Sequence, residues 1–161
     1  MLYISETSYL SLPTAHAWLT SVAATSFNTL VGVVAGSVPN FHVGTGFEQW
    51  PDWFVPVVKV VPTRDGYQVH LRGGGQFWET VLAADPDERY AVRMDRTNIL
   101  GMTALMEEWR MSPTATGTRL RWTIATDGNP VYRAAVRMSL PGFARTFRTS
   151  MRLLDRKLLA A

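Results

Sequence analysis

Apolar and polar residues alternate through much of the middle of the chain. Residues 67–72 and 89–96 carry an apolar side chain at every second position, which is the period of a strand with one buried face. Other stretches are rich in β-branched and aromatic residues and are bounded by Gly, Pro or Asp, as strands commonly are; they are residues 2–12, 54–62, 77–84, 102–111 and 118–126. The pattern predicts about seven strands, most of them consecutive in the sequence.

A helical pattern occupies the C-terminal part of the chain. Asn129 is of a type that caps helices, and Pro130 suits the first helical position. Beyond them an apolar residue recurs every three or four positions, at Phe143, Phe147, Met151, Leu154 and Leu158. Pro141 and Gly142 are expected to kink or split this helix, because proline lacks a backbone donor and clashes with the preceding turn.

Residues 13–47 give a weaker signal. Pro13 and Thr14 begin a shorter helical pattern that continues to Val22. Residues 23–47 contain several glycines, which weaken a helix, so this stretch is open between helix and loop.

Together these elements predict an α+β fold with a curved antiparallel sheet around the long C-terminal helix. Consecutive strands with short connections form antiparallel sheets, and one apolar face can be buried against a helix. A strongly curved sheet leaves a cleft beside the helix, and small ligands bind in clefts of this kind. The length of 161 residues suits one domain, residues 1–161.

Composition narrows the classes of function. The chain has no cysteine, which excludes disulfides, thiolate metal sites and cysteine nucleophiles. His16, His42 and His70 lack metal-ligand spacing, and no phosphate-binding or nucleophile motif occurs. We therefore expect no metal and no cofactor. No apolar stretch is long enough to span a bilayer and no secretory leader is recognisable, so we expect a cytoplasmic protein.

The net charge of +3 is concentrated in the C-terminal helix. Four of its arginines are spaced by three or four positions and form a stripe: Arg145, Arg148, Arg152 and Arg156. Such a stripe is either an ordinary solvated helix face or a docking surface for an acidic partner. Nucleic acid is not expected, because no recognised binding motif accompanies the arginines.

Short motifs follow one another along most of the chain. They are residues 13–18 (PTAHAW), 50–56 (WPDWFVP), 79–81 (ETV) with 85–86 (DP), and 117–122 (GTRLRW) after Trp109. In this order they resemble the START-like, or Bet v 1-like, helix-grip superfamily, in particular its polyketide cyclase/dehydrase and lipid-transport branch. The resemblance implies a helix-grip fold with an internal cavity. Residues 23–47 are longer than the usual connection, so we interpret them as an insertion near the cavity mouth.

Glu107 is the main candidate for chemistry. Leu105, Glu107, Trp109 and Met111 share one face of their strand, and Trp122 lies on the apolar face of the next. A carboxylate among such residues is desolvated, which raises its pKa and suits a general acid or base. The alternatives are that Glu107 pairs with an inward arginine, or that a bulge turns it toward solvent.

Other candidates carry weaker signals. Arg93 can face either side of its strand, and an inward arginine would stabilise an enolate or alkoxide. His42, in a Gly-rich loop, is either a proton shuttle or an ordinary surface residue. The candidate ligand contacts, several of which suit a packed core equally well, are Tyr9, Trp50, Trp53, Tyr90, Leu105, Trp109, Trp122, Met138 and Phe143.

The resemblance implies two alternative functions. One is an enzyme that cyclises, dehydrates or aromatises an apolar, oxygenated substrate by confinement and acid/base catalysis. An acyl carrier protein would then be a candidate partner for the arginine stripe. The other is a non-catalytic carrier or sensor of a lipid, quinone or similar hydrophobic molecule. A third interpretation, drawn from charge alone, is an interaction module that uses the basic helix.

Overall fold

The computed structural model describes residues 1–10, 49–85, 89–114 and 117–159. The predicted first helix, the interpreted insertion at residues 23–47 and the candidate His42 lie outside the described residues. Within them, the first element after the N-terminal strand is the short helix α3 (Trp50–Trp53).

The described residues include seven strands in one antiparallel sheet. The sheet order is β1-β7-β6-β5-β4-β3-β2, so β2 to β7 form a meander and β1 adds to the edge of β7. The strands are β1 (Leu2–Leu10), β2 (Val57–Pro62), β3 (Gly66–Leu71), β4 (Gln76–Asp85), β5 (Arg89–Thr97), β6 (Met102–Thr114) and β7 (Gly117–Gly128). The predicted sheet is confirmed.

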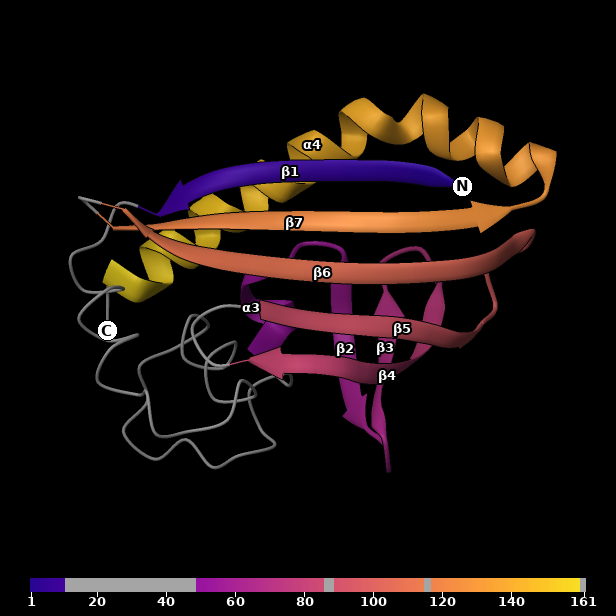
Figure 1. Cartoon of the computed structure of the whole chain (residues 1–161), viewed down its shortest axis with the longest axis horizontal. Helices are drawn as coiled ribbons and strands as arrows, with labels where there is room; N and C mark the ends of the chain where they lie inside the picture. The colour runs from indigo at the N-terminus through magenta and orange to yellow at the C-terminus, as the bar shows by residue number, and fades with distance from the viewer. Residues whose placement is uncertain (11–48, 86–88, 115–116, 160–161) are drawn as a thin grey trace.

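The sheet is strongly curved. In Figure 1, β2 and β3 run across the direction of β6 and β7. Register shifts occur between Trp78 and Glu79 in the β4–β5 pairing and between Val57 and Lys59 in the β2–β3 pairing. Bulges of this kind bend a strand and increase its twist, which helps to wrap the sheet into a concave surface.

Helix α4 (Pro130–Leu159) crosses behind β1 and β7 in Figure 1. Asn129 Oδ1 accepts a hydrogen bond from the backbone N–H of Tyr132 at 2.8 Å, so the predicted N-cap is confirmed. Pro141 and Gly142 were expected to kink or split the helix; the split is not observed, because α4 continues through Pro141. Pro141 and its neighbours Leu140 and Gly142 are exposed, so water can solvate the carbonyl that proline leaves unpaired.

The hydrophobic core lies between the concave sheet and the helices. Phe147, Met151 and Leu154 of the predicted apolar stripe are fully buried. Aromatic rings fill the region next to α3, with centroids 6.0 Å apart for Trp50 and Trp109 and 5.4 Å apart for Trp109 and Trp122. This end of the interior is therefore packed rather than hollow. No helix in the described residues is long and apolar enough to cross a membrane.

Candidate functional site

A cavity of about 100 Å³ remains between the sheet and the first half of α4. Its wall is mainly apolar, with Leu105, Ile124 and Phe143 among the lining residues. Ligand pockets typically have volumes of about 300 Å³ or more, so this cavity is small. A hollow of this order accommodates a single small ring.

Glu107 lies on the cavity wall. Its neighbours across the sheet are Val92 on β5 and Ile124 on β7, so the carboxyl projects from the concave face. Trp109 Nε1 donates a hydrogen bond to Glu107 Oε1 at 2.5 Å. No ion pair of Glu107 occurs among the described residues. The expected inward orientation of Glu107 is therefore observed. The two alternatives, an arginine partner and a bulge at this residue, are not observed among the described residues.

Burial gives Glu107 an unusual affinity for protons. Desolvation raises its pKa from 4.5 to about 7, even though the indoles of Trp109 and Trp122 lower it by favouring the charged form. A carboxyl with a pKa near neutrality is present in both protonation states under ordinary conditions. It is therefore suited to accept a proton and to return it.

The indole of Trp122 supplies a donor beside this acid. Trp122 also lines the cavity and is 4% exposed. Its N–H interacts with the Glu107 carboxyl closely enough to lower the pKa of that group, but the contact falls short of full hydrogen-bond geometry. A polar group on a bound molecule would give this N–H a better-aligned acceptor.

A second polar spot lies at the other end of the cavity, near the start of α4. Thr126 Oγ1 donates to the carbonyl of Ala104 at 2.9 Å and lies 2.7 Å from the hydroxyl oxygen of Tyr132. Because the threonine proton is used by Ala104, Tyr132 is the donor to Thr126. The oxygen of Tyr132 keeps acceptor capacity at the cavity wall.

Sequence reasoning missed a second interior acid, Glu79. It lies on β4, opposite Tyr67 of β3, and is 8% exposed. Burial raises its pKa well above the ordinary value, and the charge of Glu107 raises it further. The signal was present in the sequence, because Glu79 shares strand parity with the apolar Phe77 and Val81.

Several expected site residues lie elsewhere. Arg93 is exposed on the opposite face of the sheet from Glu107 and pairs with Asp95 at 2.9 Å, because the apolar residues of β5 occupy the inner face. Met138 is 83% exposed on α4 and does not line the cavity. The side chain of Tyr9 lies outside the described residues, as does His42.

The expected ligand contacts divide into two groups. Leu105, Trp122 and Phe143 line the cavity. The others are buried in the core and are absent from the wall: Trp50, Trp53, Tyr90 and Trp109. They pack against one another through edge-to-face contacts, because large aromatic rings fill the space next to α3. Trp109 still reaches the site through its hydrogen bond to Glu107.

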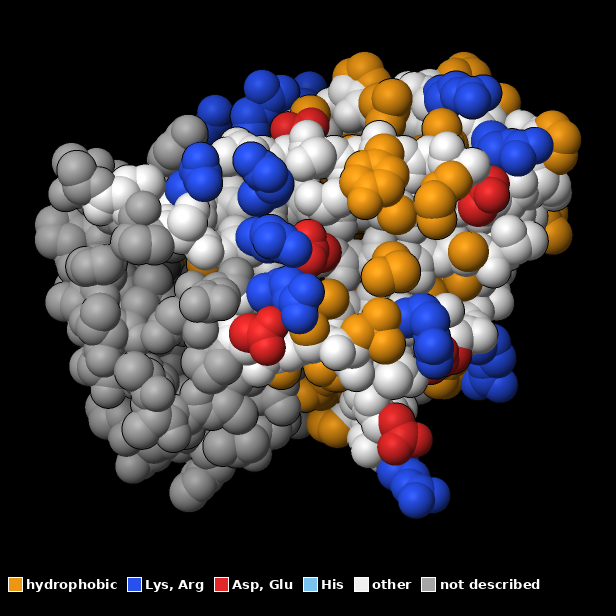
Figure 2. Space-filling view, viewed as in Figure 1, with side chains coloured by type: hydrophobic (Ala, Val, Ile, Leu, Met, Phe, Trp, Pro, Cys, Tyr) orange, Lys and Arg blue, Asp and Glu red, His pale blue; other side chains and the backbone are white. Residues whose placement is uncertain are grey.

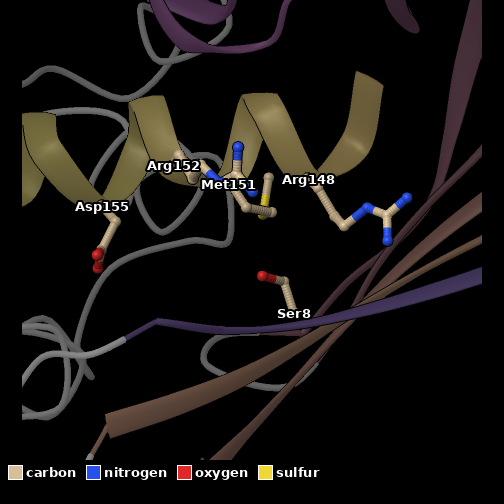
Figure 3. Close-up of a pocket in the computed structure, with 5 residues that line it drawn as sticks. All are labelled: Ser8, Arg148, Met151, Arg152 and Asp155. Atoms are coloured by element: carbon tan, nitrogen blue, oxygen red, sulfur yellow. The ribbon is translucent and has the colours of Figure 1, made fainter. Parts of the chain in front are cut away.

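The arginine stripe is solvent-exposed along its length, at Arg145, Arg148, Arg152 and Arg156. None of the four forms an ion pair with another described residue. Figure 2 shows Lys and Arg side chains at the upper left of the described surface, both along its upper edge and over the strands that lie in front of α4 in this view. In Figure 3, Arg148, Met151 and Asp155 of α4 and Ser8 of β1 border a groove of about 250 Å³.

The described residues contain no group of three or more His, Cys, Asp or Glu side chains that could hold a metal ion. Among the described residues that line the cavity, the polar groups are the Glu107 carboxyl, the Trp122 N–H and the Thr126–Tyr132 pair.

A curved antiparallel sheet that grips a long C-terminal helix around a small cavity is the architecture of START-like helix-grip proteins. The chain belongs to the family described as "Polyketide cyclase / dehydrase and lipid transport", whose model matches residues 41–158. The suspected superfamily is thereby confirmed. Comparison with curated proteins gives no match.

Solved structures share this fold. A protein from Bacillus cereus has a TM-score of 0.66 at 13% identity, over 99% of this chain and 96% of that one. The Zhui aromatase/cyclase from a Streptomyces species has a TM-score of 0.63 at 15% identity, over 98% and 93%. A START superfamily protein from Mycobacterium smegmatis has a TM-score of 0.52 at 14% identity, over 91% of this chain and 96% of that one. At these identities the similarity establishes the fold alone.

Proposed function

We propose that this protein is a small-molecule enzyme of the cyclase, aromatase or dehydratase type that acts on an apolar, oxygenated substrate. The observation that carries the proposal is Glu107, an acid with a pKa of about 7 on the wall of an apolar cavity. Family membership supports the same class of chemistry. A chain held in a reactive shape gains much of its rate from orientation, and an adjacent acid/base group adds proton transfer.

The proton chemistry needs one carboxyl that changes state. As a carboxylate, Glu107 removes a proton from the carbon next to a carbonyl group. As the resulting acid, it returns that proton to a departing hydroxyl, which leaves as water in a dehydration, or to the alkoxide formed in an aldol-type ring closure. The enzyme ends each cycle in its starting protonation state.

The Trp122 N–H is the group best suited to the developing negative charge on the substrate oxygen. Its position on the wall and its imperfect contact with Glu107 support the role that the sequence suggested for an arginine. A fixed donor in a water-poor site stabilises an oxyanion without reorganisation. The small cavity favours a substrate that places one ring or one folded segment beside Glu107.

Replacing Glu107 with Gln tests the catalytic role. Glu107→Gln keeps the shape and removes the exchangeable proton, so we expect turnover to fall by about 10²- to 10⁴-fold with little loss of binding. The outward-facing neighbour offers a matched control, Glu108→Gln, which should leave turnover unchanged. Equal turnover in the wild type and Glu107→Gln would remove Glu107 from the mechanism.

A carrier or sensor is the second candidate function, favoured by the mainly apolar lining of the cavity. In that case Glu107 and Trp122 anchor a polar group of the guest without transforming it. Native mass spectrometry of protein purified from cells distinguishes the two. A guest recovered unaltered, with no product from candidate substrates, favours the carrier, whereas a mixture of substrate and ring-closed or dehydrated product favours the enzyme.

The arginine stripe supports a partner proposal. Its four exposed arginines, which form no ion pair with another described residue, suit an acidic acyl carrier protein that delivers the substrate. We expect Arg148→Glu with Arg152→Glu to weaken binding of such a protein by about tenfold or more, with a strong salt dependence. The control carries the same charge change on the far edge of the sheet, Lys59→Glu with Arg64→Glu. Equal affinities for the two double variants would refute the docking surface.

A further inference from the structure

Glu79 is a buried acid that the proposed mechanism does not use. Its carboxyl shares the concave face with Tyr67 and Phe77 and is 8% exposed. It forms neither an ion pair nor a hydrogen bond with another described residue. Burying a carboxyl is costly, so its presence on the same face of the sheet as the cavity-lining Glu107 points to a functional role.

The groups that face Glu79 come from three neighbouring strands. They are Tyr67 on β3, Tyr90 on β5 and Glu107 on β6, each of which interacts electrostatically with Glu79 or with its neighbours. The register places Glu79 opposite Met94 and Glu107 opposite Val92, so the two acids flank β5 on the same face.

No cation offsets these acids in the described interior. Arg93 of β5 and Lys59 of β2 are exposed, as is Asp52 of α3, and the arginine stripe of α4 faces solvent. His70 of β3 alternates with the buried Tyr67 and Val69 and so lies on the outer face. Two neighbouring carboxyls without a cation do not both ionise readily, and such a pair releases its protons in two separated steps.

We propose that Glu79 is a positioning residue for Glu107, which stays a neutral acid behind the cavity-facing carboxyl and limits the pair to one negative charge. The inference rests on the proposed function, because it assumes that Glu107 exchanges a proton with a guest. The buried N–H of Trp122, whose contact with Glu107 falls short of full hydrogen-bond geometry, lies on the same wall and offers a donor to a bound polar group.

The proton balance of the pair follows from this assignment. When Glu107 takes a proton from the guest, both carboxyls are neutral, and when Glu107 returns it, the pair carries one charge again. Loss of the Glu79 proton at alkaline pH would place two negative charges in a buried site. Activity should therefore fall at alkaline pH, and this alkaline limb of the pH–activity profile should report the ionisation of Glu79.

Two substitutions separate this role from simple packing. Glu79→Gln mimics the neutral acid, so we expect turnover at neutral pH to be retained and the alkaline limb to be lost. Glu79→Asp keeps an ionisable group and should keep an alkaline limb. If Glu79 only fills space, the alkaline limb of Glu79→Gln will match that of the wild type, and the proposal is overturned.

The protonation state can be read directly, without an activity assay. The chain has six glutamates, whose side-chain carboxyls can be labelled with ¹³C and titrated by NMR, with Glu79→Gln and Glu107→Gln used for assignment. We expect the Glu79 signal to stay at its protonated position through neutral pH and to move only after Glu107 has titrated. In Glu107→Gln the Glu79 midpoint should fall, because a negative neighbour is gone, whereas Glu108→Gln should not change it.

The results distinguish failure of this inference from failure of the proposed function. The pair is overturned if Glu79 ionises with an ordinary glutamate pKa, or if its titration midpoint does not change in Glu107→Gln. This holds even if Glu107 proves essential for turnover. Conversely, an intact pair in a protein whose Glu107→Gln variant keeps full turnover overturns the catalytic role and leaves the pair standing.

Discussion

At the scale of single residues, Glu107 shows how far strand parity can carry an argument. The alternation in residues 102–111 was enough to predict that Glu107 points inward, and the register of β6 between β5 and β7 agrees. Parity could not reveal whether the neighbouring rings leave space around the carboxyl. The same pattern of apolar residues occurs at Trp50, Trp53 and Trp109, which pack in the core instead of lining the cavity. Whether a ring lines the cavity or fills the core depends on how rings from distant segments fit together, which parity does not show.

Trp109 should set the proton affinity of Glu107. Its N–H donates to the carboxylate and favours the charged form, so Trp109→Phe should raise the pKa of Glu107 above its value of about 7. The same NMR titration measures the change. Trp53→Phe is the matched control, since Trp53 belongs to the same aromatic cluster and does not bond to Glu107. If the titration midpoint of Glu107 in Trp109→Phe is equal to or lower than that in the wild type, the assigned hydrogen bond is contradicted.

At the scale of elements, local patterns located the strands well and their ends less well. The expected loop between the last two strands spans residues 112–117, yet β6 extends to Thr114 and β7 begins at Gly117. Cross-strand pairing continues past the residues that read as a turn, because the ladder supplies hydrogen-bond partners that sequence propensity does not include. Helix α3 was missed for a similar reason, since its four residues are held by packing of Trp50 and Trp53.

Helix α4 carries an internal proline that should reduce its stability. Pro141 lacks the N–H that would bond to the preceding turn, and its position is exposed. Pro141→Ala restores that donor without disturbing the core, so the free energy of unfolding should rise by about 1 to 3 kcal/mol. Urea denaturation measures this change. Ser139→Ala on the same exposed turn serves as a control for substitution by alanine, and a loss of stability in Pro141→Ala would show that the proline is required by the fold.

At the scale of the whole molecule, two buried acids make stability depend on pH. The pKa of Glu107 is raised on folding from 4.5 to about 7, so the folded state binds the proton more tightly than the unfolded state. Its stabilising contribution is complete below about pH 4.5 and is lost as the pH rises to about 7, which amounts to about 3 kcal/mol. Glu79, whose pKa is also raised by burial, adds a loss of stability of the same sign as the pH rises.

Thermal or urea unfolding across this range tests the linkage. The wild type should lose stability steadily from acidic to neutral pH, and Glu107→Gln should lose less over the same window because Gln does not ionise. Glu108→Gln, on the outer face of the sheet, should follow the wild type. Parallel curves for the wild type and Glu107→Gln would mean that Glu107 ionises freely in the folded protein.

The account depends most on a polar guest binding beside Glu107 in the small cavity. A crystal of the protein soaked with phenol, a single ring with one hydroxyl, tests this directly. We expect phenol to occupy the space among Leu105, Ile124 and Phe143, with its hydroxyl within hydrogen-bond distance of the Glu107 carboxyl and the Trp122 N–H. Phenol bound elsewhere with the cavity closed by its own side chains, or a Glu107 carboxyl turned toward bulk water, would contradict it.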